Sequence, residues 1–263
     1  MSSVRPLFVV AGIGNGTGTG AATARLFAKS GYRVALISRG PEHLNKLAAE
    51  LNQAGGEVAA TFPLKDYTPA SIKSAFASLK SHWPSSPLRV ALFNAGYGIW
   101  KPFLDITEDE VRESIDTNIV AAFAFARAVL LEFTKLELET ASEGGAAGDA
   151  RKRGTLIFTG ATAAIRGNTL TSAFAASKFG IRALSQSLAK EFGKQNIHVA
   201  HSIIDGNILT DRSKSHRNDA SWEANQDARL DPDAIAKSYL HLVKQDSSAW
   251  TWEIDLRPAH EKW

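Results

Sequence analysis

The sequence contains no cysteine among its 263 residues. This excludes disulfides, thiolate nucleophiles and cysteine-ligated metal sites, and it is typical of a reducing compartment. The seven histidines lie far apart, and the closest two, His198 and His201, fall in a stretch that predicts a strand. We therefore expect no metal site.

Long hydrophobic runs are also missing. The N-terminal "PLFVVAGI" is too short for a signal-peptide core or a membrane span, and we expect that no other apolar run reaches the length needed to cross a bilayer. The 30 basic and 27 acidic residues give a formal charge of only +3 and are scattered along the chain. We expect a cytoplasmic protein that binds neither membranes nor nucleic acids.

Short apolar runs alternate with segments of helical periodicity. The expected strands are "LFVVAGI", "YRVALIS", "EVAATFPL", "RVALFNAG", "GTLIFTGA", "IHVAHSIID" and "WTWEIDL", and segments such as "AATARLFAKSG" and "EHLNKLAAELNQAG" between them predict helices. Continuous apolar strands separated by helices indicate a parallel sheet covered on both faces. The sequence therefore predicts one domain over residues 1–263, an α/β Rossmann-type doubly wound parallel sheet of about seven strands.

Two polar segments interrupt this alternation. Residues 139–154 are small, polar and rich in glycine, which predicts a flexible surface insertion. Residues 211–232 are polar and charged and follow the sixth strand. Because open parallel sheets bind ligands beyond the carboxyl ends of their strands, this second segment is a candidate substrate lid, with an exposed loop of no special role as the alternative.

A glycine-rich turn, "AGIGNGTGTGAATARLFA", joins the first strand to the first helix. Glycines there let backbone N–H groups approach a phosphate, and the helix N-terminus favours negative charge. Two registers fit the spacing GxxxGxG, one from Gly12 and one from Gly14; we prefer the second because the helix then follows directly. The dinucleotide-binding residues expected from this turn are Gly14, Gly16, Gly18, Thr19 and Gly20.

The second strand ends in "ALISRG", which places Ser38 and Arg39 where the adenosine ribose is expected. An acidic residue there would bind both ribose hydroxyls and repel a 2′-phosphate. A serine beside a guanidinium does the reverse. The sequence therefore favours NADP(H) over NAD(H).

From about residue 6 to residue 258 the chain resembles the short-chain dehydrogenase/reductase family. Asp66 in "LKDYT", followed by Tyr67, matches the acidic residue that this family places near the adenine ring, and "FNAG" resembles the family's NNAG turn. Asn118 in "DTNIVAAF" and Lys178 match the family's active-site asparagine and lysine, and "DGNILT" resembles its PGxIxT motif, with Asp205 in place of proline. The cofactor-binding residues implied by this resemblance are Asp66, Tyr67, Asn94, Ala95, Gly96, Lys178, Gly206, Ile208 and Thr210.

The departures from the family pattern fall on two hydroxyls. Phe174 stands four residues before Lys178, where the family has tyrosine, and Ala161 stands where it has serine. In the ordinary mechanism the tyrosine protonates a carbonyl oxygen as hydride arrives and the serine stabilises that oxygen. Neither Phe174 nor Ala161 can do this, so Lys178 and Asn118 are the catalytic candidates that remain.

Three functions fit this pattern. The preferred one is an NADP(H)-dependent reductase whose acceptor is already activated, an imine, an iminium or a polarised double bond. In lacking the hydroxyl pair, the chain is similar to fungal reductases and reductase/Diels-Alderases of indole alkaloid pathways. The second is a carbonyl reductase with relocated proton donors, for which the candidates are Thr159, Thr162, Ser172 and Tyr97. The third is a cofactor-binding protein or non-redox cyclase without hydride turnover.

Aromatic side chains and two helices suggest the partners. The expected ligand is a small-molecule substrate, for which Tyr97, Trp100, Trp222 and Phe174 are candidate lining residues. Residues 107–137 and 171–193 predict helices with broad apolar faces. The family resemblance implies that these two helices form the interface of a homodimer or homotetramer.

Overall fold

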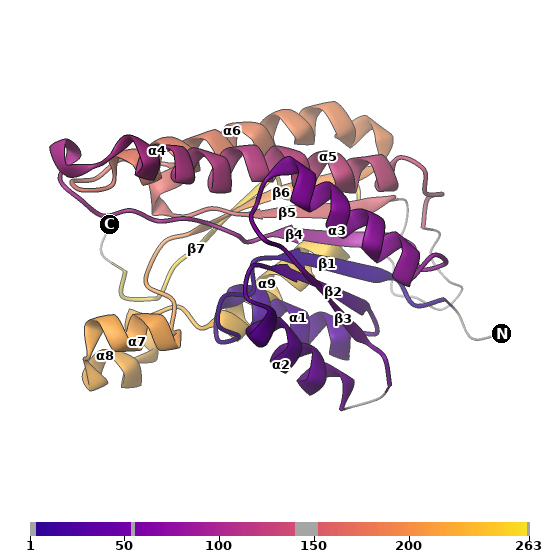
Figure 1. The fold of residues 1–263 in the computed structure, drawn as a ribbon, viewed down its shortest axis with the longest axis horizontal. Coiled ribbons are helices and arrows are strands. Elements are labelled where there is room, and N and C mark those ends of the chain that lie inside the picture. The colour runs from indigo at the N-terminus through magenta and orange to yellow at the C-terminus, as the bar shows by residue number, and fades with distance from the viewer. Residues whose placement is uncertain (1–3, 54–55, 140–151, 262–263) are drawn as a thin grey trace.

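The computed structural model describes residues 4–53, 56–139 and 152–261. Seven parallel strands form one sheet in the order β3-β2-β1-β4-β5-β6-β7 (Figure 1). Each strand matches one of the predicted apolar runs, and the fold class is confirmed: a single Rossmann-like domain. The strands are β1 (Leu7–Ala11), β2 (Arg33–Ser38), β3 (Ala59–Pro63), β4 (Leu88–Phe93), β5 (Gly154–Thr159), β6 (Ile197–Ile204) and β7 (Glu253–Leu256).

Helices cover both faces of the sheet, as continuous apolar strands require. One layer contains α1 (Thr19–Lys29), α2 (Pro41–Asn52) and α9 (Pro232–Lys244), and the other contains α3 (Pro69–His82), α5 (Ala121–Phe133) and α6 (Ser172–Phe192) (Figure 1). The strand order reverses between β1 and β4. Ligands of such sheets bind in the crevice beyond the carboxyl ends of the strands at this point.

One long apolar helix contains an irregular turn. α4 (Glu108–Ile115) passes through a π-helical turn, Asp116–Val120, into α5. By length and composition alone the stretch Glu108–Phe133 could span a bilayer, so the expectation that no segment reaches this length is wrong here. Half of its most apolar window is buried inside the domain, and core helices of globular proteins pass the same test.

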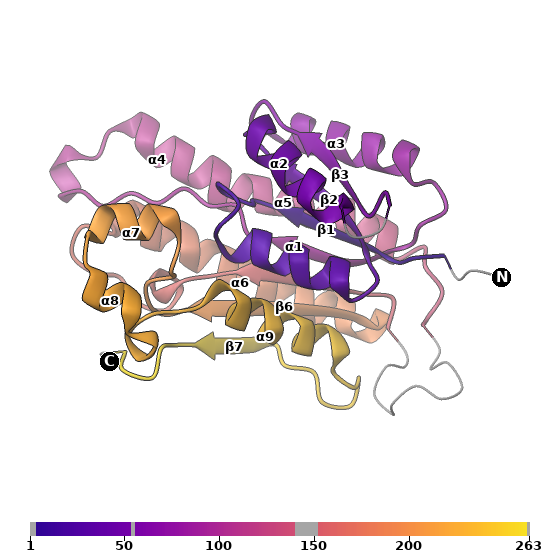
Figure 2. The same ribbon diagram turned by 90° about the horizontal axis from the view of Figure 1, so that it is seen from below.

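The segment at 211–232 is largely helical, which its polar composition did not reveal. It forms α7 (Asp211–Arg217) and α8 (Ala220–Ala224), which lie together at one end of the molecule (Figure 2). The side chains of Thr210 and Asp219 cap the two helices, and Trp222 is buried with its indole N–H donated to the carbonyl of Ala228 at 3.2 Å. Trp222 therefore forms the small core of this segment.

The predicted insertion at 139–154 lies mostly outside the described residues, which end at Glu139 and resume at Lys152. The backbone N–H of Glu139 donates to the carbonyl of Lys152 at 3.0 Å. The two ends of the insertion are therefore adjacent.

Candidate active site

The glycine-rich turn after β1 contains two positions where a side chain cannot fit. A Cβ on Gly12 would lie 2.5 Å from the backbone nitrogen of Ala95, and one on Gly20 would lie 2.1 Å from the carbonyl oxygen of Gly12. Gly12 also has a φ of +95°. The close approach of the turn to the end of β4 thus depends on Gly12 and Gly20.

Neither predicted glycine register describes the turn completely. Helix α1 begins at Thr19 with Gly18 as its N-cap, as the preferred register expects. The first tightly packed glycine, however, is Gly12, which that register omits; Gly14 has open space around its Cα. Gly14 and Gly16 have positive φ values of 59° and 93°, so they shape the exposed loop between the two packed glycines.

A nicotinamide dinucleotide fits the start of α1. The hydroxyl of Thr19 is buried and has no hydrogen-bond partner among the described residues. The carboxylate-free first turn of α1 presents backbone N–H groups beside it, which is the arrangement that binds a phosphate. The pyrophosphate would contact this orphaned hydroxyl and the backbone N–H groups of the first turn of α1.

The expected adenosine end lies at the carboxyl end of β2. The hydroxyl of Ser38 is hydrogen-bonded to the phenol of Tyr67, and the Arg39 guanidinium lies 5.1 Å from the Tyr67 ring centre. Arg39 Nη1 also forms an ion pair at 3.2 Å with Glu113 of α4, a contact that the sequence did not suggest. Burial raises the pKa of Tyr67, which therefore stays neutral.

Asp66 is an acceptor at the start of α3. Its Oδ1 accepts hydrogen bonds from the Thr68 backbone N–H, the Thr68 hydroxyl and the Ser71 hydroxyl. These hydrogen bonds, of which the one from Ser71 has the largest effect, lower the pKa of Asp66 to about 2. Its second oxygen accepts none of these bonds and can accept one from an adenine amino group.

The turn after β4 is fixed to the glycine loop. Asn94 Nδ2 donates to the carbonyl of Gly12 at 2.8 Å, and Ala95 is buried against the same residue. A Cβ on Gly96 would lie 3.3 Å from Asn118 Oδ1 and 3.6 Å from Lys178 Nζ. The predicted residues Asn94, Ala95, Gly96, Asn118 and Lys178 are therefore brought together.

Asn118 lies in the π-helical turn between α4 and α5, and π turns are frequent at functional sites. Its Nδ2, which has two protons to donate, lies within hydrogen-bond distance of the carbonyls of Tyr97 and Ser114 and of the Ser177 hydroxyl, at 2.8, 3.0 and 3.0 Å. Its Oδ1 accepts from the Tyr97 backbone N–H at 3.2 Å. Asn118 thus holds the backbone of Tyr97 against α6.

Lys178 and Phe174 occupy one face of α6, one turn apart. Lys178 Nζ lies 5.7 Å from the centre of the Phe174 ring and donates to the Thr159 carbonyl at 3.1 Å. The Phe174 ring in turn lies 5.2 Å from that of Trp100. Burial lowers the pKa of Lys178 to about 8. An ammonium group and two aromatic rings thus share this end of the sheet.

The loop after β5 carries Ala161, which is half-buried and starts a short 3₁₀ turn over Thr162–Ala164. The Thr162 hydroxyl donates to the buried carboxylate of Asp205. Asp205 also forms ion pairs with Arg257 at 2.6 Å and Arg166 at 3.8 Å. Asp205 therefore ties this loop to the C-terminal segment.

The end of β6 carries the remaining predicted residues. Gly206 has a φ of +148°, and a Cβ there would meet the Pro258 ring at 2.8 Å. Ile208 pairs with Leu230 through an isolated bridge. Thr210 caps α7, and its methyl carbon lies 3.6 Å from where a Cβ of Gly18 would stand. The 206–210 segment thus reaches the glycine loop.

The family of the chain follows from comparison with known proteins. The family model described as short chain dehydrogenase matches residues 8–221. The chain belongs to the short-chain dehydrogenase family. Membership of this family makes the chain an NAD(P)-dependent oxidoreductase.

Individual relatives agree with this family. A short-chain dehydrogenase structure from Rhodopseudomonas palustris is 31% identical, with a TM-score of 0.74, and the match covers 96% of this chain and 98% of that one. The 3-oxoacyl-(acyl-carrier-protein) reductase of Rattus norvegicus is 25% identical over 206 residues, 78% of each chain. An alcohol dehydrogenase from Thermococcus sibiricus, complexed with 5-hydroxy-NADP, shares the fold at 21% identity and a TM-score of 0.78, covering 98% of this chain and 99% of that one.

Sequence reasoning missed several residues of this site. Gly12 belonged only to the glycine register that we did not prefer. Glu113 and Ser114 belong to no recognisable sequence motif. Ser177 was noticeable as the neighbour of Lys178, yet its hydroxyl faces Asn118 and donates to the Phe174 carbonyl, so it is part of the support for α6.

Proposed function

We propose that this dehydrogenase is an NADP(H)-dependent reductase that transfers hydride to an acceptor already activated as an imine, an iminium or a polarised double bond. The observation that carries the proposal is the pair on α6. In the ordinary family pattern a phenol would stand at position 174, and here the Lys178 ammonium faces an aromatic ring at 5.7 Å. Such a branch of the family has kept its lysine and lost its acid.

Reduced nicotinamide supplies the hydride in this family. Lys178 would hold its ribose: one donated hydrogen bond goes to the Thr159 carbonyl, and an ammonium has three protons to give. The Thr19 hydroxyl and the backbone N–H groups at the start of α1 would bind the pyrophosphate. Asn118 holds the Tyr97 backbone and α6 at a fixed separation through its contacts with the Tyr97 N–H and carbonyl and with the Ser177 hydroxyl.

An iminium or a protonated imine needs no proton from the protein, whereas a polarised carbon–carbon double bond takes its proton from water after the hydride has added. Hydride adds to the carbon of a C=N⁺ bond, the π electrons move onto nitrogen, and the product is a neutral amine. Phe174 and Trp100 contribute apolar surface and a π face, and a cation over such a face gains roughly 0.5–2 kcal/mol. The lowered pKa of Lys178 reduces the positive charge beside a cationic acceptor as the pH rises through 8.

The positions of the hydroxyls that could act as relocated proton donors support an acceptor that is already activated. Thr159 is bonded to Tyr239 in the opposite helix layer at 2.9 Å, and Thr162 is bonded to Asp205. Ser172 is solvent-exposed. Tyr97 is half-buried, and Asn118 binds its backbone. It is the remaining candidate proton donor if the protein is a carbonyl reductase.

The deciding experiment follows NADPH oxidation with a panel of cyclic imines and a panel of ketones. We expect turnover of imines by the wild type, and Phe174→Tyr should leave that rate within about tenfold, because the added phenol supplies an acid the reaction does not use. The matched variant Tyr97→Phe should also retain it.

Two other outcomes would replace the proposal. A double variant, Phe174→Tyr with Ala161→Ser, that revives ketone reduction while the wild type ignores every imine indicates a disabled carbonyl reductase. Tight NADPH binding without turnover in either panel indicates a cofactor-binding protein or a non-redox cyclase.

A further inference from the structure

Asn15 is the only asparagine in the chain that is followed by glycine. It is exposed in the glycine-rich turn, and no atom of the described residues, apart from its own chain neighbours, lies within 4 Å of where a Cβ of Gly16 would stand. The side-chain amide of an asparagine can react with the backbone nitrogen of the next residue, and a glycine leaves that nitrogen unshielded because it has no Cβ. Asn15 and Gly16 therefore meet the chemical requirement for deamidation.

Two donors bind the amide oxygen of Asn15. The hydroxyl of Thr17 donates to Asn15 Oδ1 at 2.7 Å, and the backbone N–H of Thr17 donates to the same oxygen at 3.3 Å. Such donors stabilise the negative charge that develops on a carbonyl oxygen when its carbon is attacked. The amide nitrogen reaches Asp211 Oδ2 at 3.5 Å. The side chain is thus held in place, and its amide carbon is made more electrophilic.

One hydrogen bond restrains the reaction. The backbone N–H of Gly16, whose nitrogen must attack, donates to the Ile13 carbonyl at 3.2 Å. This distance is at the long end for an N–H···O hydrogen bond. Opening of the turn therefore limits the rate, and a ligand that keeps the turn closed slows the reaction.

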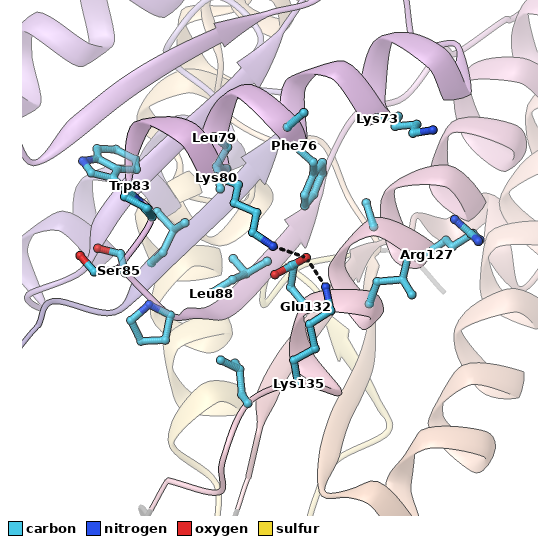
Figure 3. Close-up of a pocket in the computed structure, with 18 of the residues that line it drawn as sticks. Lys73, Phe76, Leu79, Lys80, Trp83, Ser85, Leu88, Arg127, Glu132 and Lys135 are labelled. Atoms are coloured by element: carbon cyan, nitrogen blue, oxygen red, sulfur yellow. Dashed lines mark hydrogen bonds and ion pairs between the residues drawn. The ribbon is translucent and has the colours of Figure 1, made fainter.

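Subunit contacts on α5 and α6 would leave this turn accessible. The groove between α3 and α5, shown in Figure 3, shares Arg127 and Leu131 with the face that we expect at the interface. Leu7 and Leu88, the first residues of β1 and β4, line that groove, whereas Asn15 follows the last residue of β1. Asn15 therefore lies at the opposite end of β1 from the groove.

We propose that Asn15 is a deamidation site and that the carboxylate formed there weakens dinucleotide binding. The Gly16 nitrogen loses its proton to water and bonds to Asn15 Cγ, the bond from Cγ to Nδ2 breaks, and the amide nitrogen takes a proton from water and leaves as ammonia. Water then opens the resulting cyclic imide to aspartate or isoaspartate. The net reaction consumes water and releases ammonia, and nothing is oxidised or reduced.

The new charge opposes the cofactor in two ways. A carboxylate at position 15 faces the carboxylate of Asp211, so the contact between the glycine loop and α7 becomes repulsive. It also adds negative charge to the loop that leads into the first turn of α1, where we expect the pyrophosphate. Because NADPH and NADH carry the same pyrophosphate, both lose affinity. The effect depends on dinucleotide binding and not on which acceptor is reduced.

Peptide mapping by mass spectrometry follows deamidation while the cofactor-free protein is incubated at mildly alkaline pH, and enzymatic methylation of isoaspartate gives a second readout. Asn225 is an internal control, because it is exposed and its Oδ1 accepts from the Asp227 backbone N–H at 3.0 Å, but Gln226 follows it. We expect Asn15 to react at least about tenfold faster than Asn225. Saturating NADP⁺ should slow the reaction of Asn15 several-fold and leave that of Asn225 unchanged.

Binding measurements test the consequence for the cofactor. Asn15→Asp should raise the Kd for NADPH and for NADH equally, by about fivefold at low salt and by less at high salt, because ions screen exposed charges. Asn15→Gln, which would need a larger and slower-forming ring, should keep its starting Kd during an incubation in which the wild type loses affinity. Gln195→Glu, the same change of charge at an exposed position just before β6, should alter the Kd less than about twofold.

Three results would overturn the proposal. The first is deamidation of Asn15 that is no faster than that of Asn225. The second is a wild-type Kd for both cofactors in Asn15→Asp. The third is an equal rise of the Kd in Gln195→Glu and Asn15→Asp.

Discussion

The guanidinium of Arg39 lies 3.2 Å from the carboxylate of Glu113, so an ion pair joins the end of β2 to helix α4. Both side chains are about half exposed. If Arg39 is the residue that receives the 2′-phosphate of NADP(H), then Glu113 occupies the same guanidinium and competes with that phosphate.

This relationship predicts cofactor preference. NADPH should bind at least about tenfold more tightly than NADH, since a charge-assisted contact contributes roughly 1.5–3 kcal/mol. Arg39→Ala should remove the preference. Equal affinities for the two cofactors in calorimetry, or an unchanged ratio in Arg39→Ala, would remove Arg39 from this role.

The competition between Glu113 and the 2′-phosphate can be tested separately. Glu113→Gln should strengthen NADPH binding by up to about fivefold, because an exposed ion pair is worth roughly 0.2–1 kcal/mol, and should leave NADH binding unchanged. Glu108→Gln, on the same helix, is the matched control. A Glu113→Gln effect equal for both cofactors would show that Glu113 does not act through the phosphate.

Lys178 should impose a pH dependence on cofactor affinity. Its pKa of about 8 results from burial, so its positive charge is lost as the pH rises through 8. The Kd for NADPH should therefore increase above pH 8 in the wild type. Lys178→Ala should have a higher Kd and no such inflection, and Lys190→Ala should match the wild type. A pH profile that is identical in Lys178→Ala would contradict this assignment.

The acid stability of the fold should depend on two histidines in β6. Burial lowers the pKa values of His198 and His201 to about 4, below the ordinary value of 6.5. Between pH 6.5 and pH 4 the unfolded chain therefore binds protons that the folded chain does not, and stability falls as the pH falls. Each histidine contributes up to about 3 kcal/mol of this loss.

Urea unfolding at several pH values tests this dependence. His198→Gln should flatten the decline of the unfolding free energy between pH 6.5 and pH 4.5. His43→Gln, at an exposed position on α2, should leave the slope as it is in the wild type. A His198→Gln protein with the wild-type slope would assign the decline to other groups.

Assembly stays a prediction, and the structure suggests where to test it. We propose a homodimer or homotetramer built on α5 and α6, whose outer faces expose Phe123, Leu131 and Phe179. A shallow apolar groove between the two helices includes Phe123, Leu131 and Leu188. Phe123→Asp should therefore produce monomers in light scattering at micromolar concentration. A wild-type monomer under these conditions would rule the interface out.

Much of the fold was readable because each strand is a short apolar run between turn residues. Helix α3 was overlooked because its sequence is dominated by small and polar residues; its signals were the Thr68 cap and Pro69 at the first turn. The helices of the 211–232 segment were missed for the same reason, although Thr210 and Asp219 are good N-caps. Local capping outweighed polar composition in both places.

The site was less predictable where it depends on contacts between distant segments. Which glycines must be glycine is decided by the approach of Gly12 to Ala95, 83 positions away. The pairing of Arg39 with Glu113 and the π turn at Asn118 likewise have no local sequence signature. Motif matching identified the residues of the site but not these supporting contacts.

The glycine loop and the 211–232 segment are joined directly. The backbone N–H of Asp211, the first residue of α7, donates to the Thr17 hydroxyl at 3.2 Å, and the Asn15 amide reaches the Asp211 carboxylate at 3.5 Å. These two contacts tie the glycine loop to the start of α7. We predict that a dinucleotide bound at the start of α1 lies beneath them, so that they open when it enters and enclose it afterwards. We therefore expect compulsory-order kinetics, in which the cofactor is the first ligand to arrive and the last to depart, and loosening these contacts with Thr17→Ala should make the order random.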